Sequence, residues 1–171
     1  YLDPSRQKVL IGYSMGATPA LKILAGHSHE VDKIILFYPG IYTTEAYSHN
    51  FGDDFKRTIS QPYSYRQNDT ISLLSTFKGK VLLVLGEYDG LDPQEYGKPA
   101  GSSVGETEIN GRKCYSPIPK EVIDMITEVV PVERLTYIRV PGCDHAMMMW
   151  MRQNPDKAQD LLNQINDFLK N

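Results

Sequence analysis

A single serine lies between two glycines in the stretch Gly12-Tyr13-Ser14-Met15-Gly16, directly after an apolar run. The order G-x-S-x-G is typical of a serine nucleophile on a strand-to-helix turn, where strained backbone geometry lifts the hydroxyl above a sheet. We expect both glycines to be required, because side chains at either flank would collide across so sharp a turn. An ordinary glycine-rich turn is the competing interpretation. The apolar run before the serine and the helical pattern after it favour a nucleophile.

A serine hydroxyl needs a base to remove its proton and a carboxylate to orient that base. Two later parts of the chain offer these groups in the order acid, then histidine. Asp89 follows the apolar run at residues 81–85, and His145 follows the run at residues 135–140. In an open parallel sheet, ligands bind outside the carboxyl ends of the strands, which all lie at one edge of the sheet. We therefore expect Ser14, Asp89 and His145 to converge there.

Other residues compete for these roles. Asp92 lies in the same turn as Asp89 and is the rival acid, but Asp89 is nearer the end of the expected strand. Asp144 adjoins His145, and neighbours in sequence rarely face each other well enough to hold an imidazole, so we expect Asp144 to cap its loop. The remaining histidines lie in polar surroundings and are interpreted as solvated: His27, His29 and His49.

The elements that must position these groups follow from the pattern of apolar residues. Runs rich in branched side chains occur at residues 9–11, 34–38, 81–85 and 135–140, and they are mostly continuous, as in strands covered on both faces. Helical patterns lie at residues 20–25, 120–130 and 155–169, with a short helix expected near 71–76. This alternation predicts an α/β fold: an open, mostly parallel sheet with flanking helices.

Two long stretches interrupt this alternation within what we interpret as one domain, residues 1–171. Residues 41–78 form a polar, tyrosine-rich excursion, and residues 90–118 form a long glycine-rich loop. Both are expected to lie above the sheet edge as walls or a cap over the site. The tyrosines could line a pocket or be exposed. The methionine-rich residues 147–151 are interpreted as core packing in preference to an acyl-pocket wall.

Composition excludes several classes of protein. The net charge is −3, from 18 basic and 21 acidic residues without a basic stripe, so no nucleic-acid partner is expected. No apolar run approaches the roughly 20 residues that a membrane span needs, and no signal-peptide pattern is visible. Two cysteines without metal-ligand spacing indicate free thiols in a reducing compartment. We therefore expect a cytoplasmic location, unless a signal lies upstream.

The three motifs together resemble the C-terminal half to two-thirds of the α/β-hydrolase superfamily, its serine esterases and thioesterases above all. GYSMG resembles the nucleophile elbow, LGEYDGLDP the acid turn and PGCDHAM the histidine loop. The resemblance implies that Ser14 is the nucleophile, Asp89 the acid and His145 the general base. It implies that the N–H of Met15 is one oxyanion-hole donor. It further implies hydrolysis of a small-molecule carboxylic ester or thioester through an acyl-enzyme, with no cofactor and no metal.

In that superfamily the second oxyanion donor and about half of the sheet precede the elbow. We therefore expect an α/β-hydrolase fold that lacks its N-terminal strands, with the strand before Ser14 as an unpaired edge. Such an edge calls for the upstream half of the fold, or for a partner chain that covers it. Three alternatives use the same residues: a peptidase, an acyltransferase, and a non-catalytic hydrolase-like binding or assembly module.

Overall fold

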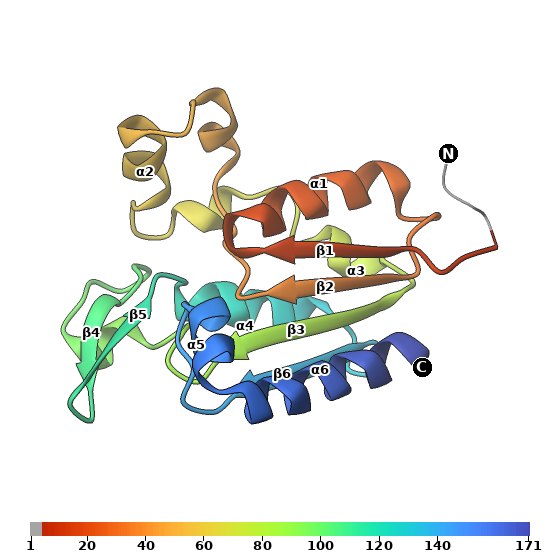
Figure 1. The fold of residues 1–171 in the computed structure, drawn as a ribbon. Coiled ribbons are helices and arrows are strands. Elements are labelled where there is room, and N and C mark those ends of the chain that lie inside the picture. The colour runs from red at the N-terminus through yellow and green to blue at the C-terminus, as the bar shows by residue number, and fades with distance from the viewer. Residues whose placement is uncertain (1–4) are drawn as a thin grey trace.

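Four parallel strands form the main sheet of the computed structural model, which describes residues 5–171. They are paired in the order β1-β2-β3-β6, and in Figure 1 all four arrowheads point toward the same end of the molecule. Each strand coincides with one of the apolar runs in the sequence, so the predicted parallel α/β sheet is confirmed. The bounds are β1 (Val9–Tyr13), β2 (Lys33–Phe37), β3 (Lys80–Gly86) and β6 (Leu135–Val140).

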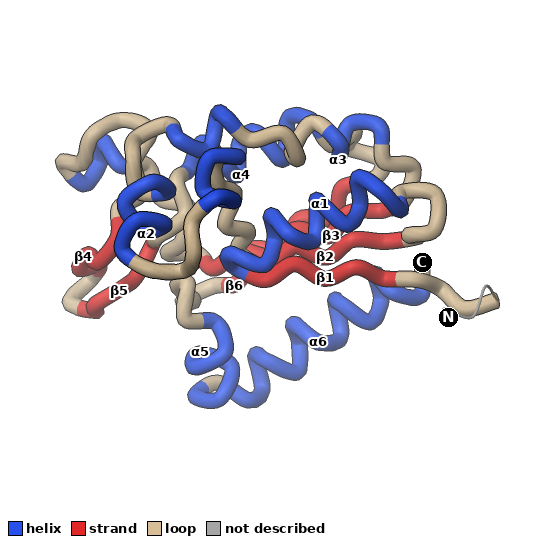
Figure 2. Tube along the Cα trace, turned by 90° about the horizontal axis from the view of Figure 1, so that it is seen from above, coloured by secondary structure: helices blue, strands red, loops and turns tan. Residues whose placement is uncertain are grey.

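Helices cover both faces of this sheet. Figure 2 shows one layer on one face, and the two C-terminal helices on the other. The first layer comprises α1 (Ala17–His27), α3 (Leu73–Thr76) and α4 (Lys120–Val129). The second comprises α5 (Met147–Gln153) and α6 (Pro155–Lys170). Within the described part of the chain, no helix combines the length and the apolar character needed to cross a membrane.

The core lies on the two central strands. Apolar side chains of β2 and β3 are almost completely buried between the helix layers, which explains why their sequences are continuous apolar runs. Lys33 at the start of β2 is also buried, and its ammonium donates hydrogen bonds to the carbonyls of Phe168 and Leu169 in the last turn of α6. A cation at the C-terminal end of a helix is favourable. Lys33 therefore fixes α6 against the sheet.

β1 is the edge strand of the sheet in residues 5–171, as expected from the sequence. Ile11 and Tyr13 on this strand are 58% and 46% exposed, unlike the apolar residues of β2 and β3. Ser14, in the turn directly after β1, therefore lies at the edge of the described sheet rather than in its middle.

The two long excursions lie at the end of the sheet to which the strands point (Figure 1). Residues 41–78 contain α2 (Asp53–Ile59), α3 and two short 3-10 helices, η2 (Thr44–Ser48) and η3 (Ser64–Gln67). Residues 90–118 were expected to be a loop, and this expectation is wrong. They contain η4 (Pro93–Tyr96) and an antiparallel hairpin of β4 (Gly105–Ile109) and β5 (Arg112–Ser116).

The pattern of apolar runs does not predict this hairpin, because its strands, GETEI and RKCYS, are mostly polar. Asn110 and Gly111 connect them, both with positive φ, at 51° and 75°. An Asn-Gly pair in this conformation is the preferred two-residue turn between antiparallel strands. The turn, rather than the strands, is thus the signal that predicts this element.

Candidate active site

Ser14 lies in a strained turn between β1 and α1. Its φ is 48°, in the left-handed region that side-chain-bearing residues rarely occupy. The turn continues as η1 (Ser14–Gly16) into α1, and the Ser14 carbonyl accepts hydrogen bonds from the N–H groups of Ala17 and Gly40, the latter at 2.8 Å. The expected strained geometry is present, and backbone hydrogen bonds from α1 and from the loop after β2 hold it.

The two glycines that flank this serine have different reasons to be there. A Cβ on Gly12 would lie 2.7 Å from the Cα of Ala17, so only glycine allows β1 and α1 to approach this closely. Gly16 has a φ of −71°, and a Cβ there would meet nothing within 4 Å. The expectation that both glycines prevent a collision is therefore confirmed for Gly12 and wrong for Gly16. At Gly16 the backbone has already entered helical geometry and faces open space.

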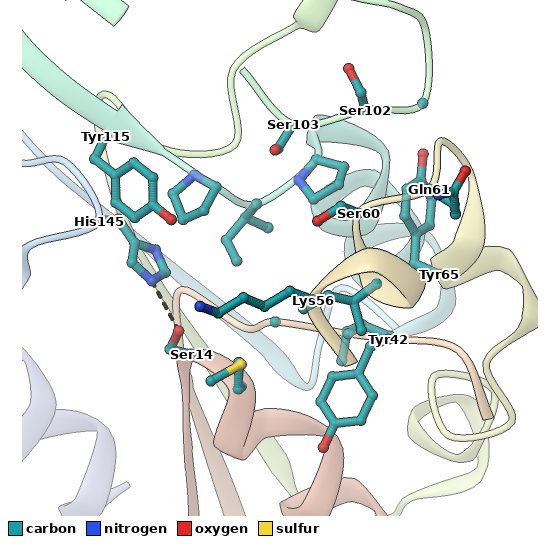
Figure 3. A pocket seen from close by; sticks show the side chains of 18 residues that line it. Ser14, Tyr42, Lys56, Ser60, Gln61, Tyr65, Ser102, Ser103, Tyr115 and His145 are labelled. Carbon is teal, nitrogen blue, oxygen red and sulfur yellow. Dashed lines mark hydrogen bonds between the residues drawn. The ribbon is translucent and has the colours of Figure 1, made fainter. Parts of the chain in front are cut away.

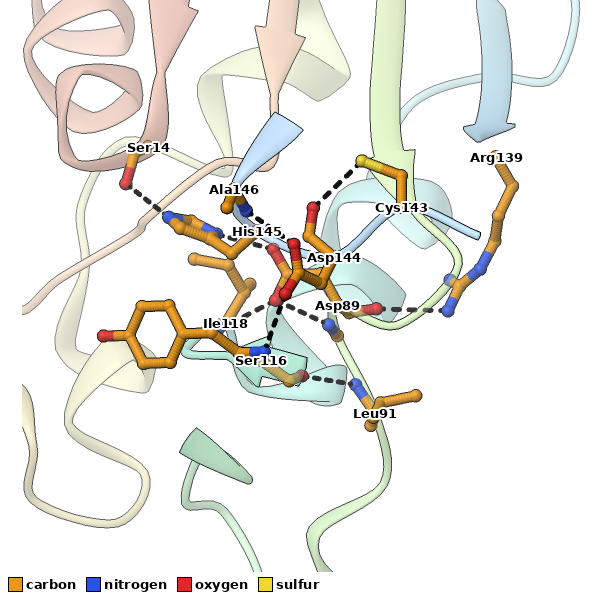
Figure 4. A network of polar contacts seen from close by, with 12 residues as sticks. Ser14, Asp89, Leu91, Ser116, Ile118, Arg139, Cys143, Asp144, His145 and Ala146 are labelled. Atoms are coloured by element: carbon orange, nitrogen blue, oxygen red, sulfur yellow. Dashed lines mark hydrogen bonds and ion pairs between the residues drawn. The ribbon is translucent and has the colours of Figure 1, made fainter. Parts of the chain in front are cut away.

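A continuous chain of hydrogen bonds joins Ser14, His145 and Asp89. Ser14 Oγ lies 2.9 Å from His145 Nε2, and His145 Nδ1 lies 2.6 Å from Asp89 Oδ2 (Figure 4). The imidazole is 14% exposed and the carboxylate 0%. Because the carboxylate can only accept at Nδ1, that nitrogen carries a proton, and Nε2 of a neutral imidazole is left to accept one from Ser14. The sequence-predicted convergence of these residues is thus observed.

The buried Asp89 carboxylate has further donors. Its Oδ1 accepts hydrogen bonds from the N–H groups of Gly90, at 2.9 Å, and Ile118, at 3.4 Å. Arg139 on β6 donates to the carbonyls of Glu87 and Asp89, which holds the turn after β3 in place. A buried carboxylate is tolerated only when hydrogen bonds replace its lost hydration. These contacts replace the lost hydration of the Asp89 carboxylate and hold it against the imidazole.

The rival groups have other partners. Asp92 accepts a hydrogen bond from the N–H of Gln94 at 3.0 Å and begins η4, so its carboxylate caps this short helix. Cys143 lies in the histidine loop, and burial raises the pKa of its thiol to about 12, so the thiol stays protonated. His27 is exposed and contacts Glu30 at 3.0 Å. In the described chain, Ser14 and Asp89 are the side chains hydrogen-bonded to His145.

The β4–β5 hairpin holds the histidine loop. The Asp144 carboxylate accepts a hydrogen bond from the N–H of Ala146 at 3.0 Å (Figure 4), as expected for a loop-capping residue. It accepts another from the N–H of Tyr115, also at 3.0 Å. In return, the N–H of His145 donates to the carbonyl of Tyr115 at 3.0 Å. The position of the imidazole therefore depends on an element that the apolar pattern did not predict.

Two tyrosine rings lie against the imidazole. Tyr38, directly after β2 and 1% exposed, packs edge-on with its ring centroid 4.6 Å from that of His145, and Tyr115 does the same at 5.7 Å. Burial raises the pKa of the Tyr38 phenol, which therefore stays neutral. Sequence reasoning missed both residues, although Tyr38 has the same signal as Asp89, a polar group at the end of a buried strand.

A cavity of about 540 Å³ opens beside Ser14 and His145. The two excursions supply most of its wall, as Figure 3 shows. Of the tyrosines that the sequence offered as a lining, Tyr42 and Tyr65 line the cavity, whereas Tyr47 and Tyr63 do not. None of residues 147–151 lines it. Met147 and Trp150 are buried in the core as expected, but Met148 and Met149 are 51% and 61% exposed, so the interpretation as core packing is wrong for these two. The size lies within the range of small-molecule sites in proteins.

Met15 lies in η1 between Ser14 and α1 and also lines the cavity. The neighbouring N–H of Gly40 is already used by the Ser14 carbonyl. The role of the Met15 N–H as an oxyanion donor stays a prediction. In residues 5–171, no group of three or more His, Cys, Asp and Glu side chains is arranged to hold a metal ion.

No protein-family model and no curated protein matches the sequence. Solved structures do match the fold. MGS-MChE2, an α/β-hydrolase enzyme from the metagenome of lagoon sediments at Mar Chica, Morocco, matches 96% of this chain with a TM-score of 0.57 and 15% identity. A serine hydrolase involved in carbazole degradation, CarC, matches 99% with a TM-score of 0.54 and 14% identity. This chain adopts part of the α/β-hydrolase fold.

A meta-cleavage product hydrolase, CumD, also matches, over 96% of this chain with a TM-score of 0.54 and 12% identity. The chain spans 63%, 66% and 65% of the length of these three structures. The expectation of a partial α/β-hydrolase fold is confirmed. At these identities, what is shared with the three hydrolases is the fold.

Proposed function

We propose that this chain carries the catalytic site of a serine hydrolase that cleaves carboxylic ester or thioester bonds through an acyl-enzyme. The observation that carries the proposal is the chain of hydrogen bonds from Ser14 through His145 to the buried Asp89. It ends at a cavity large enough for a small or medium acyl substrate. The α/β-hydrolase enzymes with the same fold support a hydrolytic reaction.

In the first half of the reaction, Ser14 Oγ attacks the acyl carbon while its proton passes to His145 Nε2. The Asp89 carboxylate stabilises the imidazolium that forms. The carbonyl oxygen becomes an oxyanion in a tetrahedral intermediate. When this intermediate collapses, the bond to the leaving group breaks and the imidazolium protonates the departing alcohol or thiol. The acyl group is then esterified to Ser14.

In the second half, a water molecule takes the place of the leaving group. His145 Nε2 removes a proton from the water as the water oxygen attacks the acyl carbon of the ester on Ser14. Collapse of the second tetrahedral intermediate breaks the bond to Ser14 Oγ, which recovers its proton from the imidazolium. The products are the free acid and the unchanged protein. None of these steps uses a cofactor.

The oxyanion in both halves needs donors that are already in place. The N–H of Met15, beside the N-terminal end of α1, is proposed as one donor. The second donor is proposed to come from outside this chain, together with the strands that would cover β1. The exposure of Ile11 and Tyr13 on β1 supports this part of the proposal, because further strands paired with β1 would bury such side chains. Loss of one oxyanion donor typically lowers kcat by about 10²- to 10³-fold.

A series of chromogenic esters and thioesters of increasing acyl length tests the proposal. We expect hydrolysis that declines once the acyl group outgrows the cavity, and that falls to background in Ser14→Ala. Equal hydrolysis by Ser14→Ala would overturn the proposal. A Ser14-dependent reaction that releases the leaving group without free acid, when an alcohol or amine is present, would instead indicate acyl transfer. Cleavage of peptides but not esters would indicate a peptidase.

A further inference from the structure

One cationic side chain of α2 lies in the cavity beside the proposed nucleophile. Lys56 lines the cavity together with Ser14 and His145. In Figure 3 its amine is directed along the cavity toward these two residues, away from the backbone of α2. Lys56 is an exposed residue of α2. Its amine nevertheless points to where a substrate would lie.

The amine of Lys56 has no carboxylate partner in the described chain. Lys56 forms no ion pair within residues 5–171, whereas its neighbour Arg57 pairs with Asp54 on the same helix at 2.6 Å. The two cations of α2 therefore differ. Arg57 is neutralised by a residue one turn earlier and lies outside this cavity, and Lys56 brings an uncompensated positive charge into it.

The rest of the cavity wall does not offset this charge. Among residues 5–171, no aspartate or glutamate lines the cavity, and the carboxylate of Asp89 is fully buried and paired with the imidazole. The other polar groups of the wall include the hydroxyls of Ser60 and Ser103, which can donate hydrogen bonds. Apolar residues such as Ile41 and Ile59 complete the wall. A partly enclosed cavity with one cation and hydroxyl donors favours an anionic ligand.

We infer that the substrate carries a carboxylate remote from the bond that is cleaved, and that Lys56 binds it and thereby selects for it. This inference rests on the proposed function, because it concerns the same cavity. The carboxylate can belong to the acyl side, as in a half-ester of a dicarboxylic acid, or to the leaving group, as in the ester of a hydroxy acid. Both sources present the same chemistry to the amine, a carboxylate that accepts a charge-assisted hydrogen bond.

Matched pairs of esters test the inference and separate the two sources. On the acyl side, 4-nitrophenyl hydrogen adipate is compared with its neutral methyl ester. On the leaving-group side, 3-acetoxybenzoate is compared with methyl 3-acetoxybenzoate. Lys56→Gln should lower kcat/KM for one anionic ester by about 10- to 100-fold, the usual loss of a hydrogen bond to a charged group, and leave its neutral partner within about 2-fold. Arg57→Gln, the matched control, should change neither.

Two results would overturn the inference. One is an unchanged kcat/KM of Lys56→Gln for both anionic esters. The other is an equal loss on anionic and neutral esters, which would mean that Lys56 acts on the oxyanion or on the fold. The expected loss on the adipate places the carboxylate on the acyl side, and the expected loss on the acetoxybenzoate places it on the leaving group.

A binding measurement separates this inference from the proposed hydrolysis. In Ser14→Ala, monomethyl adipate and dimethyl adipate are titrated and followed by NMR shifts of residues around the cavity. We expect tighter binding of the anionic ester, and loss of this preference in Ser14→Ala with Lys56→Gln. If the preference is present but the longest protein that contains this chain hydrolyses no ester, the anion site stands and the hydrolase proposal is wrong. If esters are hydrolysed by Ser14 without such a preference, the anion site is wrong and the hydrolase stands.

Discussion

His145 Nδ1 lies 2.6 Å from the Oδ2 of Asp89, a carboxylate that is fully buried. The residues come from the loops after β6 and β3, two neighbouring strands of the sheet. Pairing with the imidazole and with two backbone N–H groups compensates the burial of the carboxylate. The same pairing leaves Nε2 facing Ser14, so the orientation of the imidazole depends directly on Asp89.

Replacing Asp89 by asparagine should lower kcat by about 10⁴-fold, because an amide can donate to Nδ1 and stabilise the wrong tautomer of the imidazole. The measurement is hydrolysis of a neutral chromogenic ester. Asp92→Asn is the matched control, since Asp92 caps η4 and should leave kcat within about 3-fold of the original value. A loss in Asp92→Asn as large as that in Asp89→Asn would mean that the acid has been assigned to the wrong residue.

The glycines beside Ser14 should differ in their tolerance of a side chain. Gly12→Ala places a Cβ 2.7 Å from the Cα of Ala17 and should lower the free energy of unfolding by about 1 to 3 kcal/mol or prevent folding. Gly16→Ala meets open space at negative φ and should change it by less than about 0.5 kcal/mol. Chemical denaturation checks both. Equal destabilisation by the two substitutions would contradict the geometry of this turn.

Glu121 joins the excursion over the cavity to α4. Its carboxylate accepts hydrogen bonds from the hydroxyl of Tyr65, at 2.9 Å, and from the guanidinium of Arg66, and Tyr65 is 2% exposed. Glu121→Ala leaves that hydroxyl without its acceptor and should cost about 1 to 2 kcal/mol of unfolding free energy. Glu128→Ala on the same helix is the exposed control and should change little.

This contact also has a predictable pH dependence. The hydrogen bond from Arg66 holds the pKa of Glu121 below its ordinary value of 4.5. A lowered pKa in the folded state gives stability that is present above the unfolded pKa and is lost as the pH falls through the folded pKa. The stability difference between the original chain and Glu121→Ala should therefore be full near neutral pH and shrink below about pH 4.5. A difference that grows on acidification would contradict this assignment.

The exposed edge at β1 should make the chain associate with itself. Ile11, 58% exposed, lies on a strand whose outer edge is unpaired in the described residues. We expect light scattering to show association that increases with concentration and that Ile11→Lys reduces. Ile23→Lys, at a similarly exposed position on α1, is the control and should not reduce it. A chain that stays monomeric at all concentrations would show that this edge needs no cover.

The sequence was sufficient to predict the parallel sheet and the meeting of its strand ends. Branched apolar runs identify strands buried on both faces, and Ser14, Asp89 and His145 each follow such a run. These are the features that depend on burial, for which the sequence carries a strong signal. The motif at Ser14 adds the strained turn, because its position between a strand and a helix is a local property of the chain.

What the sequence did not predict depends on contacts between distant segments. The hairpin that holds the histidine loop is polar, so only its Asn-Gly turn marks it. Nothing in the pattern around Lys56 distinguishes it from Arg57, since the direction of each side chain is set by the helix face that packs on the cavity. The sequence likewise does not show that a side chain would collide at Gly12 but not at Gly16, because this depends on how closely β1 and α1 pack in the fold.

Covalent labelling of Ser14 by a fluorophosphonate, followed by mass spectrometry, tests the central claim most directly. The reagent reacts with a serine that a histidine activates and leaves ordinary serines unmodified. It is applied to this chain and to the longest protein that contains it. We predict one adduct, on Ser14, that is absent in Ser14→Ala and slowed by at least about 10³-fold in His145→Ala. The account would be contradicted if the longest protein that contains this chain forms no adduct on Ser14. It would also be contradicted if His145→Ala reacts at the same rate as the original protein.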